Sequence, residues 1–507
     1  MRELKKESYS LFKKIELVES SVDKKNIKTL LNNLVACIRE LYLIDVKDDI
    51  KRIEVGEDII DFLIKVGVIQ NKEELPILKK ILGSDYTRII FIISKYVELK
   101  VEDDDSLKKY MDYYRKESMQ EYLNDTHSPT IVDFFCGAGG MSLGFSQNNY
   151  KVLLANDIEP ACTQTYSFNH LDMPKERIIT GDIKEIVDHV DKYVSEKVDV
   201  IIGGPPCQGF SEANRQRLID DPRNVLYKYY VKGVEKLRPK FFVMENVKGM
   251  LKVAEQVRED FHNLEGEEYD VSYHVFNARN FSVPQNRERL IYIGVRSDIS
   301  IKYNITARDI INEIEEYTKN LRDYSLSDAI EDLRELQALT IQNATELDTE
   351  ESGKKIDSNR QTQNSSYVNL INHGVYSKLT FNHKARYNND RDIEIFRRMW
   401  PGDKSDSERI ADIMPYTSRN GIFKDKYYKL RPNEVCKTIT AHMKFDCNMY
   451  IHPSQARGLT PREAARIQSY PDDYFFTGSY TKTYMQVGNS VPPLMSNVIA
   501  NVIKPYL

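Results

Sequence analysis

A cysteine near the middle of the chain follows a run of residues typical of a buried strand. Cys207 lies in the segment Gly-Gly-Pro-Pro-Cys-Gln-Gly-Phe-Ser at 203–211, directly after the apolar run at 198–202. In open α/β sheets, ligands bind outside the carboxyl ends of the strands, and two prolines stiffen the loop that carries this thiol. Cys207 is therefore a candidate nucleophile, although a free cysteine is more often a small buried hydrophobic residue.

A glycine-rich turn and two acids have the arrangement of a nucleotide-type cofactor site. The segment 135–140, Phe-Cys-Gly-Ala-Gly-Gly, follows a predicted strand, and its glycines let the backbone approach a ligand closely. The next strand ends at Asp157, which is placed to accept hydrogen bonds from ribose hydroxyls. Asp182 follows another short apolar run and is placed to accept from an adenine amino group. A nicotinamide dinucleotide is the main rival ligand, but the turn lacks a full Gly-x-Gly-x-x-Gly.

Further along the chain, a strand-end acid and a pair of arginines are candidates for proton transfer and base contact. Glu245 follows the predicted strand at 241–244 and precedes Asn246. Acids positioned in this way are commonly catalytic, and the alternative is a solvated acid at a strand end. Arg287 and Arg289 flank an acid, and on sequence alone this cluster is typical of a surface ion-pair group.

Together these segments resemble the motifs of the cytosine-C5 DNA methyltransferase family, of the bacterial and phage restriction–modification type. They occur in the family's order, at 131–142, 203–211, 245–247, 285–289 and 488–493. The resemblance covers 129–300 and 457–507 well, 370–456 loosely and 1–125 not at all.

The resemblance implies covalent catalysis on cytosine. The Cys207 thiolate would add to C6, so that C5 becomes nucleophilic enough to take the methyl group of S-adenosyl-L-methionine. Glu245 would stabilise or protonate N3, with Asn246 beside it. Arg289 would contact O2, and Arg287 would support the site. Because C5 of a paired base is out of reach of such a pocket, the base would be flipped out of the duplex.

The resemblance also implies a set of contacts to S-adenosyl-L-methionine. Many family members carry an aromatic residue where Ile158 stands in this chain. The implied contacts are Phe135, Cys136, Gly137, Ala138, Gly139 and Gly140 for the methionine part, Asp157 for the ribose, Ile158 at the position where other members stack the base, Asp182 and Ile183 for the adenine, and Pro205, Asn489, Ser490 and Val491 around the site.

Two regions are predicted to contact double-stranded DNA. The polar stretch 209–223 is expected to close over the target. Region 367–456 occupies the family's target-recognition position and contains 15 Lys+Arg against 10 Asp+Glu, which favours a phosphate-facing surface. For any one candidate, an ordinary surface side chain is the alternative. The candidates are Gln208, Ser211, Arg215, Arg217, Arg223, Arg386, Arg419, Thr438, Thr440, His442 and Lys444.

Composition restricts the remaining possibilities. The chain has 507 residues, which predicts two or three domains, and 41% hydrophobic and 29% charged residues are typical of a globular protein. Its net charge of −5 does not itself suggest nucleic acid, so phosphate contacts would depend on local patches.

The six cysteines form no Cys-x-x-Cys pair, so we expect neither a metal site nor a disulfide framework. A nucleophilic thiolate fits the reducing cytoplasm, and no apolar stretch approaches the ~18 residues of a membrane span.

The elements that would position these residues follow from the periodicity. From 130 onward, short apolar runs alternate with helical segments, which predicts an α/β fold with a mainly parallel, Rossmann-like methyltransferase sheet. The six predicted strands are 130–135, 152–156, 198–202, 241–244, 271–276 and 290–295. Thr460 and Glu463 predict a capping box at the start of a helix. The predicted domains are a helical accessory domain at 1–125, a catalytic domain at 129–300, a connector at 301–366 with a polar loop at 345–366, a recognition region at 367–456 and a C-terminal return to the catalytic domain at 457–507.

Two other functions stay open at this point. One is the same chemistry on transfer RNA, which a branch of the family performs; the size of region 367–456 favours DNA. The other is a catalytically silent DNA-binding protein of the same fold, which would have no use for the Cys207 thiol. A restriction endonuclease acting on the same DNA site is a candidate partner.

Overall fold

The computed structural model describes most of the chain from residue 55 onward. The described residues are 55–65, 68–69, 71–100, 122, 124–170, 173–206, 226–266, 268–342, 344, 348–357, 365–373, 380–415, 426–445 and 448–507. The predicted helical positions near residues 30–38 lie outside these ranges, as do Cys207 and the whole of 207–225.

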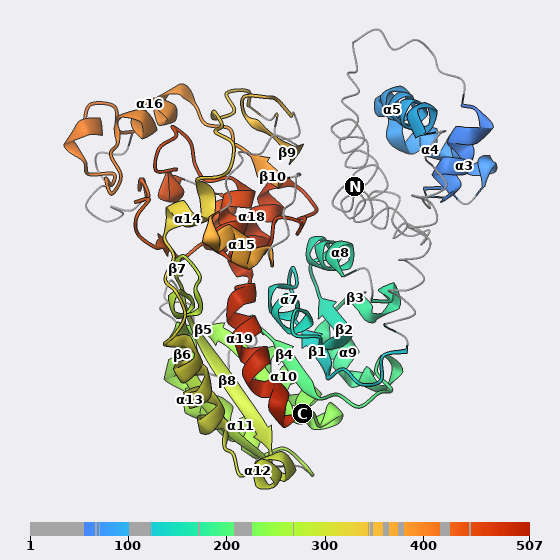
Figure 1. Ribbon diagram of the computed structural model, residues 1–507, viewed down its shortest axis with the longest axis vertical. Helices are drawn as coiled ribbons and strands as arrows, with labels where there is room; N and C mark the ends of the chain where they lie inside the picture. Colours follow the sequence, from blue (N-terminus) through green and yellow to red (C-terminus); the bar gives the residue numbers. More distant parts are fainter. Residues whose placement is uncertain are drawn as a thin grey trace.

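A seven-stranded sheet forms the centre of the catalytic part (Figure 1). Its strand order is β3-β2-β1-β4-β5-β8-β6; the first five strands are parallel, and β8 runs antiparallel to both of its neighbours. The strands are β1 (Thr130–Phe134), β2 (Lys151–Asp157), β3 (Ile178–Thr180), β4 (Val200–Gly203), β5 (Phe241–Val247), β6 (Tyr269–Asn277) and β8 (Glu288–Arg296). The mostly parallel α/β class is therefore confirmed. All six predicted strands are present, and β3 was missed because it is only three residues long, of which two are apolar.

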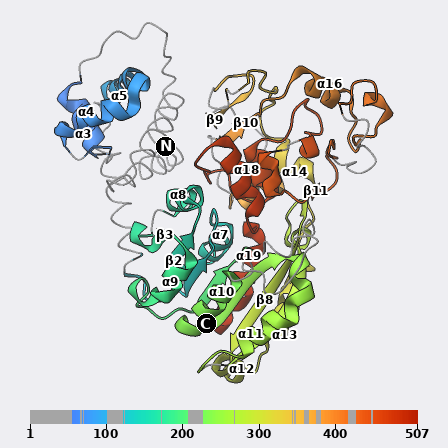
Figure 2. The same ribbon diagram turned by 180° about the vertical axis from the view of Figure 1, so that it is seen from behind.

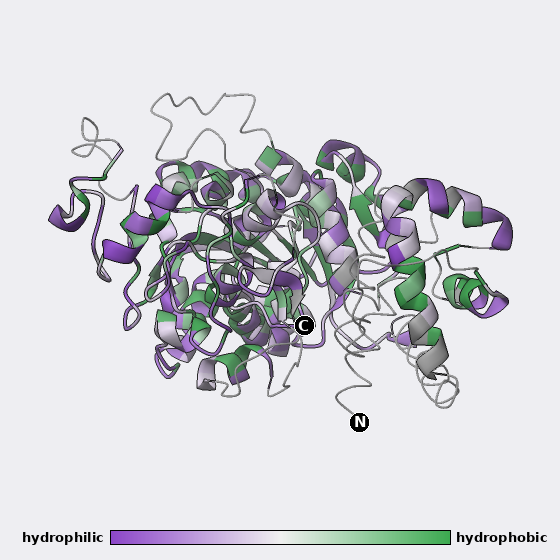
Figure 3. Ribbon diagram, turned by 90° about the horizontal axis from the view of Figure 1, so that it is seen from above, coloured by the Kyte–Doolittle hydropathy of each residue, from purple (hydrophilic) through white to green (hydrophobic). Residues whose placement is uncertain are grey.

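Helices cover both faces of this sheet, which explains why its strands are rich in Val and Ile on both sides. One core packs α7 (Gly140–Ser146), α13 (Ala307–Thr318) and α19 (Pro493–Ile503) on the first face, and α9 (Ile183–Asp188), α10 (Leu226–Leu237) and α11 (Ala254–His262) cover the second (Figure 2). Helix α19 packs against α7, where the Ser496 hydroxyl donates to the Gly140 carbonyl at 3.2 Å. Figure 3 shows the strands mostly in hydrophobic green and the surrounding helices in alternating colours.

The structure places two parts of the predicted connector in folded elements. Helix α13 buries Ile310, Ile311 and Ile314 against β6 and β8, so this stretch packs with the catalytic sheet. The polar stretch 345–366, which we expected to be a loop, contains β9 (Gly353–Asp357), and β9 pairs antiparallel with β10 (Thr380–Lys384).

A smaller, mainly helical unit lies at the carboxyl edge of the sheet. It contains α14 (Leu326–Ile330), α15 (Ser366–Ile371), α16 (Asp390–Arg398), α17 (Pro461–Ile467), α18 (Tyr480–Asn489) and the short strands β7 (Gln285–Asn286) and β11 (Cys436–Lys437). The predicted capping box of α17 is confirmed: Thr460 accepts from the Glu463 backbone N–H and the Glu463 side chain accepts in return.

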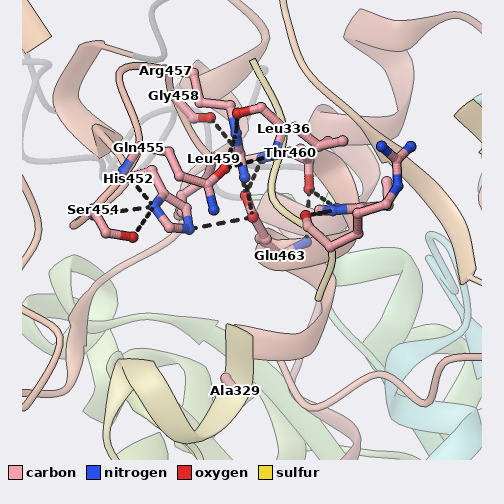
Figure 4. Close-up of polar contacts among 12 residues, drawn as sticks. Ala329, Leu336, His452, Ser454, Gln455, Arg457, Gly458, Leu459, Thr460 and Glu463 are labelled. Carbon is pink, nitrogen blue, oxygen red and sulfur yellow. Dashed lines mark hydrogen bonds and ion pairs between the residues drawn. The ribbon is translucent and has the colours of Figure 1, made fainter. Parts of the chain in front are cut away.

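A buried ion pair holds the start of α17 in place (Figure 4). Arg457 donates to both carboxylate oxygens of Glu463 at 2.8 and 2.7 Å, and both side chains are almost fully buried. Burial opposes the charge of Glu463, but the Arg457 guanidinium outweighs burial and holds the pKa of that carboxyl far below its usual range. This cluster is structural, because its hydrogen bonds stay within the smaller unit, the Leu336 carbonyl included.

The described N-terminal residues form a separate helical core. Helices α3 (Glu57–Lys65), α4 (Leu75–Leu82) and α5 (Tyr86–Lys100) bury Leu63, Ile89 and Ile93 between them. The helical character predicted for this region is confirmed for these residues. No helix within the described ranges is long and apolar enough to cross a membrane. The same residues contain no cluster of three or more His, Cys, Asp or Glu suited to a metal ion.

Candidate active site

The candidate site lies at the carboxyl ends of β1 and β4, where the strand order reverses. Strand β1 pairs with β2 on one side and with β4 on the other, and Phe134 lies opposite Gly203. The glycine-rich turn 135–140 follows β1, and the segment leading to Cys207 follows β4. Such a topological switch point opens a crevice between the two loops, and this is where ligands bind in open α/β sheets.

The turn after β1 has a backbone conformation that requires its glycines. Gly137 and Gly139 have φ values of 54° and 82°, and Phe135 has a left-handed φ of 58°. A non-glycine residue pays roughly 1–2 kcal/mol for that conformation, and such strain concentrates at functional sites. A Cβ atom on Gly140 would overlap the Ser490 hydroxyl and the Val491 carbonyl. The turn therefore packs directly on the C-terminal segment that the sequence placed at the same site.

Asp157 is fixed beside this turn by two backbone donors. Its carboxylate accepts from the Gly137 N–H at 2.9 Å and from the Glu159 N–H at 2.8 Å. Burial raises the pKa of Asp157. The adjacent Ile158 side chain is 71% exposed, which leaves an apolar surface free at the end of β2.

Asp182 follows the neighbouring strand β3 and caps α9. Its side chain accepts from the Lys184 N–H at 2.9 Å. Asn156 joins the two strand ends by donating to the carbonyls of Ile179 and Gly181 at 3.0 and 3.1 Å. A hypothetical Cβ on Gly137 would meet nothing within 4 Å. A ligand containing a ribose and a purine would therefore fit beside this turn. It would meet the acids Asp157 and Asp182, the exposed Ile158 side chain and the open space at Gly137.

Beneath the turn lies a buried acid that sequence reasoning missed. Asp133 is fully buried in β1 and accepts from the Ser142 hydroxyl, while its other oxygen has no hydrogen-bond partner. Burial raises the pKa of Asp133 to about 8. Its signal in the sequence was a single acid inside an otherwise apolar strand.

Glu245 and Arg289 form a largely buried ion pair beside the segment that follows β4. Arg289 Nε lies 2.7 Å from Glu245 Oε1, and the two side chains are 13% and 11% exposed. The antiparallel register of β5 and β8, with Val247 opposite Arg289, brings them together. A Cβ on Gly204 would lie 2.8 Å from Glu245 Oε2, so the second carboxylate oxygen faces the start of the Cys207 loop.

Asn246 holds the other side of that loop. Its amide donates to the Pro205 carbonyl at 2.9 Å and accepts from the Val247 N–H at 2.9 Å. These bonds give Asn246 a positioning role. Cys207, Gln208, Ser211, Arg215, Arg217 and Arg223 lie outside the described residues, so their placement stays a prediction.

Arg287 is fully buried and does not face the crevice as Arg289 does. Its guanidinium donates to the carbonyls of Ile439, Gly488 and Ser490 at 2.7, 3.0 and 2.8 Å. Sequence reasoning placed Arg287 among the catalytic residues with a supporting role, which stays a prediction; the geometry shows that its guanidinium bonds backbone carbonyls of two other segments.

The candidate DNA contacts in the recognition region have mixed environments. The Thr438 hydroxyl donates to the Asn286 carbonyl at 2.7 Å, and Thr440 lies 3.2 Å from the Tyr450 hydroxyl. Arg386 donates to the carbonyls of Met443 and Phe445. His442 is exposed, whereas Arg419 and the side chain of Lys444 fall outside the described parts of the chain. Gln285, which sequence reasoning did not single out, accepts from the Ile439 N–H at 2.8 Å.

The fold and the site define an α/β enzyme class whose switch point carries a glycine turn, two strand-end acids and an acid–arginine pair. Residues 129–505 match the model of the C-5 cytosine-specific DNA methylase family, so the chain belongs to this family of DNA cytosine-5-methyltransferases.

Individual relatives agree with this assignment. The chain is 33% identical over 397 residues to Type II methyltransferase M.DdeI of Desulfomicrobium norvegicum, covering 74% of this chain and 88% of the relative. It is 32% identical over 400 residues to Type II methyltransferase M1.HphI of Haemophilus parahaemolyticus, covering 77% and 91%. A solved Escherichia coli structure, a putative DNA modification methyltransferase encoded within a prophage, aligns with a TM-score of 0.57 at 24% identity, covering 75% and 99%. That structure supports the fold, and the predicted family is confirmed.

Proposed function

We propose that the protein transfers a methyl group from S-adenosyl-L-methionine to C5 of cytosine within a short sequence of duplex DNA, through a covalent bond between Cys207 and C6. The observation that carries this proposal is the Glu245–Arg289 pair, which faces the start of the Cys207 loop at the edge shared with the glycine turn. When bound, the cofactor supplies an electrophilic methyl group on its sulfonium.

The chain's own residues prepare cytosine for that methyl group. The Cys207 thiolate forms a bond to C6, and the electron pair of the C5–C6 double bond shifts toward N3. Glu245 stabilises or protonates N3, and Arg289 holds the carboxylate and contacts O2. Once C5 has bonded the methyl carbon, water acting as a base takes the C5 proton, and N3 returns to Glu245 any proton that it received. The C5–C6 double bond then re-forms, and the Sγ–C6 bond breaks to release the thiolate.

The low exposure of the acid–arginine pair supports base flipping. Glu245 and Arg289 are nearly buried at the sheet edge, and a cytosine stacked in a duplex cannot reach them. The target base therefore leaves the helix to enter the crevice. The recognition region 367–456, with its excess of Lys and Arg, is the surface that we assign to the flanking DNA.

The cofactor site that we propose uses the turn 135–140, Asp157 and Asp182. Asp157 is already oriented by two N–H donors, so its remaining acceptor capacity faces the ribose position. The exposed Ile158 side chain provides an apolar contact for the adenine ring. Ser490 and Val491 close the site from the C-terminal segment.

A direct test is transfer of label from tritiated S-adenosyl-L-methionine to unmethylated duplex DNA and to transfer RNA in parallel, followed by sequencing of the modified positions. We expect label at C5 of cytosine within one short DNA motif. Label in RNA alone would contradict the proposed substrate. The motif would also allow a search for a restriction endonuclease that acts on the same site, which we propose as a partner.

The covalent step has its own test. A duplex with 5-fluorocytosine at the target position should become trapped on the protein, because fluorine cannot leave as a cation after methyl transfer. Mass spectrometry should find protein, DNA and methyl group joined at Cys207. Cys207→Ser should bind DNA without trapping, whereas Cys436→Ser, at a cysteine buried in β11, should trap normally. Trapping by the Cys207→Ser variant would contradict the mechanism.

A further inference from the structure

One fully buried arginine connects two segments that the proposed function assigns to different ligands. Arg287 bonds the Ile439 carbonyl in the segment 438–445 and the carbonyls of Gly488 and Ser490 in the segment 488–491. The segment 438–445 carries candidate DNA contacts, and 488–491 carries candidate cofactor contacts. Because a planar guanidinium directs its N–H groups along fixed lines, one side chain fixes the two segments relative to each other.

Neighbouring contacts make the two segments one hydrogen-bonded unit. Gln285 accepts from the Ile439 N–H at 2.8 Å and donates to the Gln468 side chain at 3.0 Å. Gln468 donates to the Val487 carbonyl at 2.8 Å. A Cβ on Gly488 would overlap the backbone of Thr440. The two segments are therefore in direct backbone contact as well as joined by Arg287.

The environment of Arg287 argues against a direct role in chemistry. Its exposed fraction is 0%, and its three hydrogen bonds end on backbone carbonyls. Arg289, two residues along the same stretch, instead pairs with Glu245 at the crevice. The two arginines of one sequence motif thus have separate tasks.

We propose that Arg287 is a positioning residue that couples cofactor binding to DNA binding. This inference rests on the proposed function of the two segments. A ligand that holds either segment also holds the carbonyls that Arg287 bonds, so the second ligand meets a partner that is already ordered. By linkage, each ligand then raises the affinity for the other by the same factor.

The test measures that factor in the full-length protein. The dissociation constant of a duplex bearing the target motif is determined by fluorescence anisotropy with and without saturating S-adenosylhomocysteine, and the ratio of the two values is the coupling factor. We expect a wild-type ratio of about fivefold or more. In Arg287→Lys the ratio should fall close to one, because a single ammonium cannot meet the carbonyls of both segments.

A gentler variant covers the case in which Arg287→Lys does not fold. Thr438→Val removes the hydroxyl bond to the Asn286 carbonyl beside Arg287 and keeps the side chain's shape. Loss of a simple DNA contact would weaken binding equally with and without S-adenosylhomocysteine. If Thr438→Val instead loosens the segment 438–445, the coupling factor itself falls. This second result is the one that we expect.

Arg457→Lys is the matched control. Arg457 is also fully buried and bonds the carbonyls of Leu336 and Gly458 together with Glu463, all outside the two coupled segments. It should lower the melting temperature and leave the ratio unchanged. Equal ratios in wild type and Arg287→Lys would overturn the proposed coupling and leave the proposed function standing. A wild-type ratio of one, measured when both ligands bind, would have the same meaning. Binding of neither ligand by the wild type would overturn the proposed function as well.

Discussion

At the scale of single residues, the Glu245–Arg289 pair is the strongest indication that this site is catalytic. Glu245 and Arg289 face each other because β5 and β8 run antiparallel in a fixed register. Burial lowers the pKa of Arg289, and the Glu245 carboxylate opposes this shift. The carboxylate thus offsets part of the cost of burying the Arg289 charge, while the second Glu245 oxygen is directed toward the start of the Cys207 loop.

Glu245→Gln should abolish most of the catalysis while leaving the cofactor site intact. Without the carboxyl, N3 of cytosine loses its proton donor, and we expect kcat to fall by about 10²- to 10⁴-fold. Calorimetric titration with S-adenosylhomocysteine should give an unchanged affinity. The neighbouring Glu288 pairs with Lys248 in solvent, so Glu288→Gln should leave kcat unchanged. An equal loss in both variants would show that the effect of Glu245 is not specific.

At the scale of elements, the sequence predicted what local pattern determines and missed what distant contacts determine. The strands, the glycine turn after β1 and the capping box of α17 follow from neighbouring residues. The partners of Arg287 do not, because Ile439 and Gly488 lie 152 and 201 positions away. Asp133 was missed for a related reason, since a charged residue in a strand gives no sign of the hydroxyl that will pair with it.

The junction between α7 and the C-terminal segment yields a prediction at this scale. In Gly140→Ala the new methyl group would displace Ser490 and Val491, and overpacking of this kind costs typically 1–3 kcal/mol. We expect the affinity for S-adenosylhomocysteine to fall by roughly 5- to 150-fold, because the displaced segment closes the proposed cofactor site and 1.4 kcal/mol corresponds to a tenfold change. Gly233→Ala, which crowds the Phe134 ring from α10 on the opposite face, should lower stability with little change in that affinity. Loss of affinity in Gly233→Ala but not in Gly140→Ala would exclude the proposed role of the 490–491 segment in cofactor binding.

At the scale of the whole molecule, residues that belong physically to the catalytic part begin before residue 125, where the predicted accessory domain ends. The family match begins at residue 129, and we predicted an accessory domain ending at residue 125. Tyr122, however, packs in the core of the catalytic sheet, where its hydroxyl donates to the Val152 carbonyl at 2.8 Å. Lys151 lies over its ring at 4.7 Å. Tyr122 therefore belongs physically to the part that follows it.

Two truncations separate a structural role of this boundary from a DNA-binding role of the N-terminal helices. A protein lacking residues 1–120 keeps Tyr122 and should melt near the full-length temperature, because α3–α5 bury their apolar side chains among themselves. Removing residues 1–125 also removes Tyr122, and loss of a buried aromatic side chain should destabilise the remainder by roughly 3–5 kcal/mol. If the helices contact DNA, both truncations will weaken duplex binding and reduce its salt dependence. Unchanged affinity in the 1–120 truncation would leave α3–α5 without a DNA-binding role. The destabilisation of the longer truncation would then be explained by the loss of Tyr122 together with Asp125, whose carbonyl accepts from Lys151.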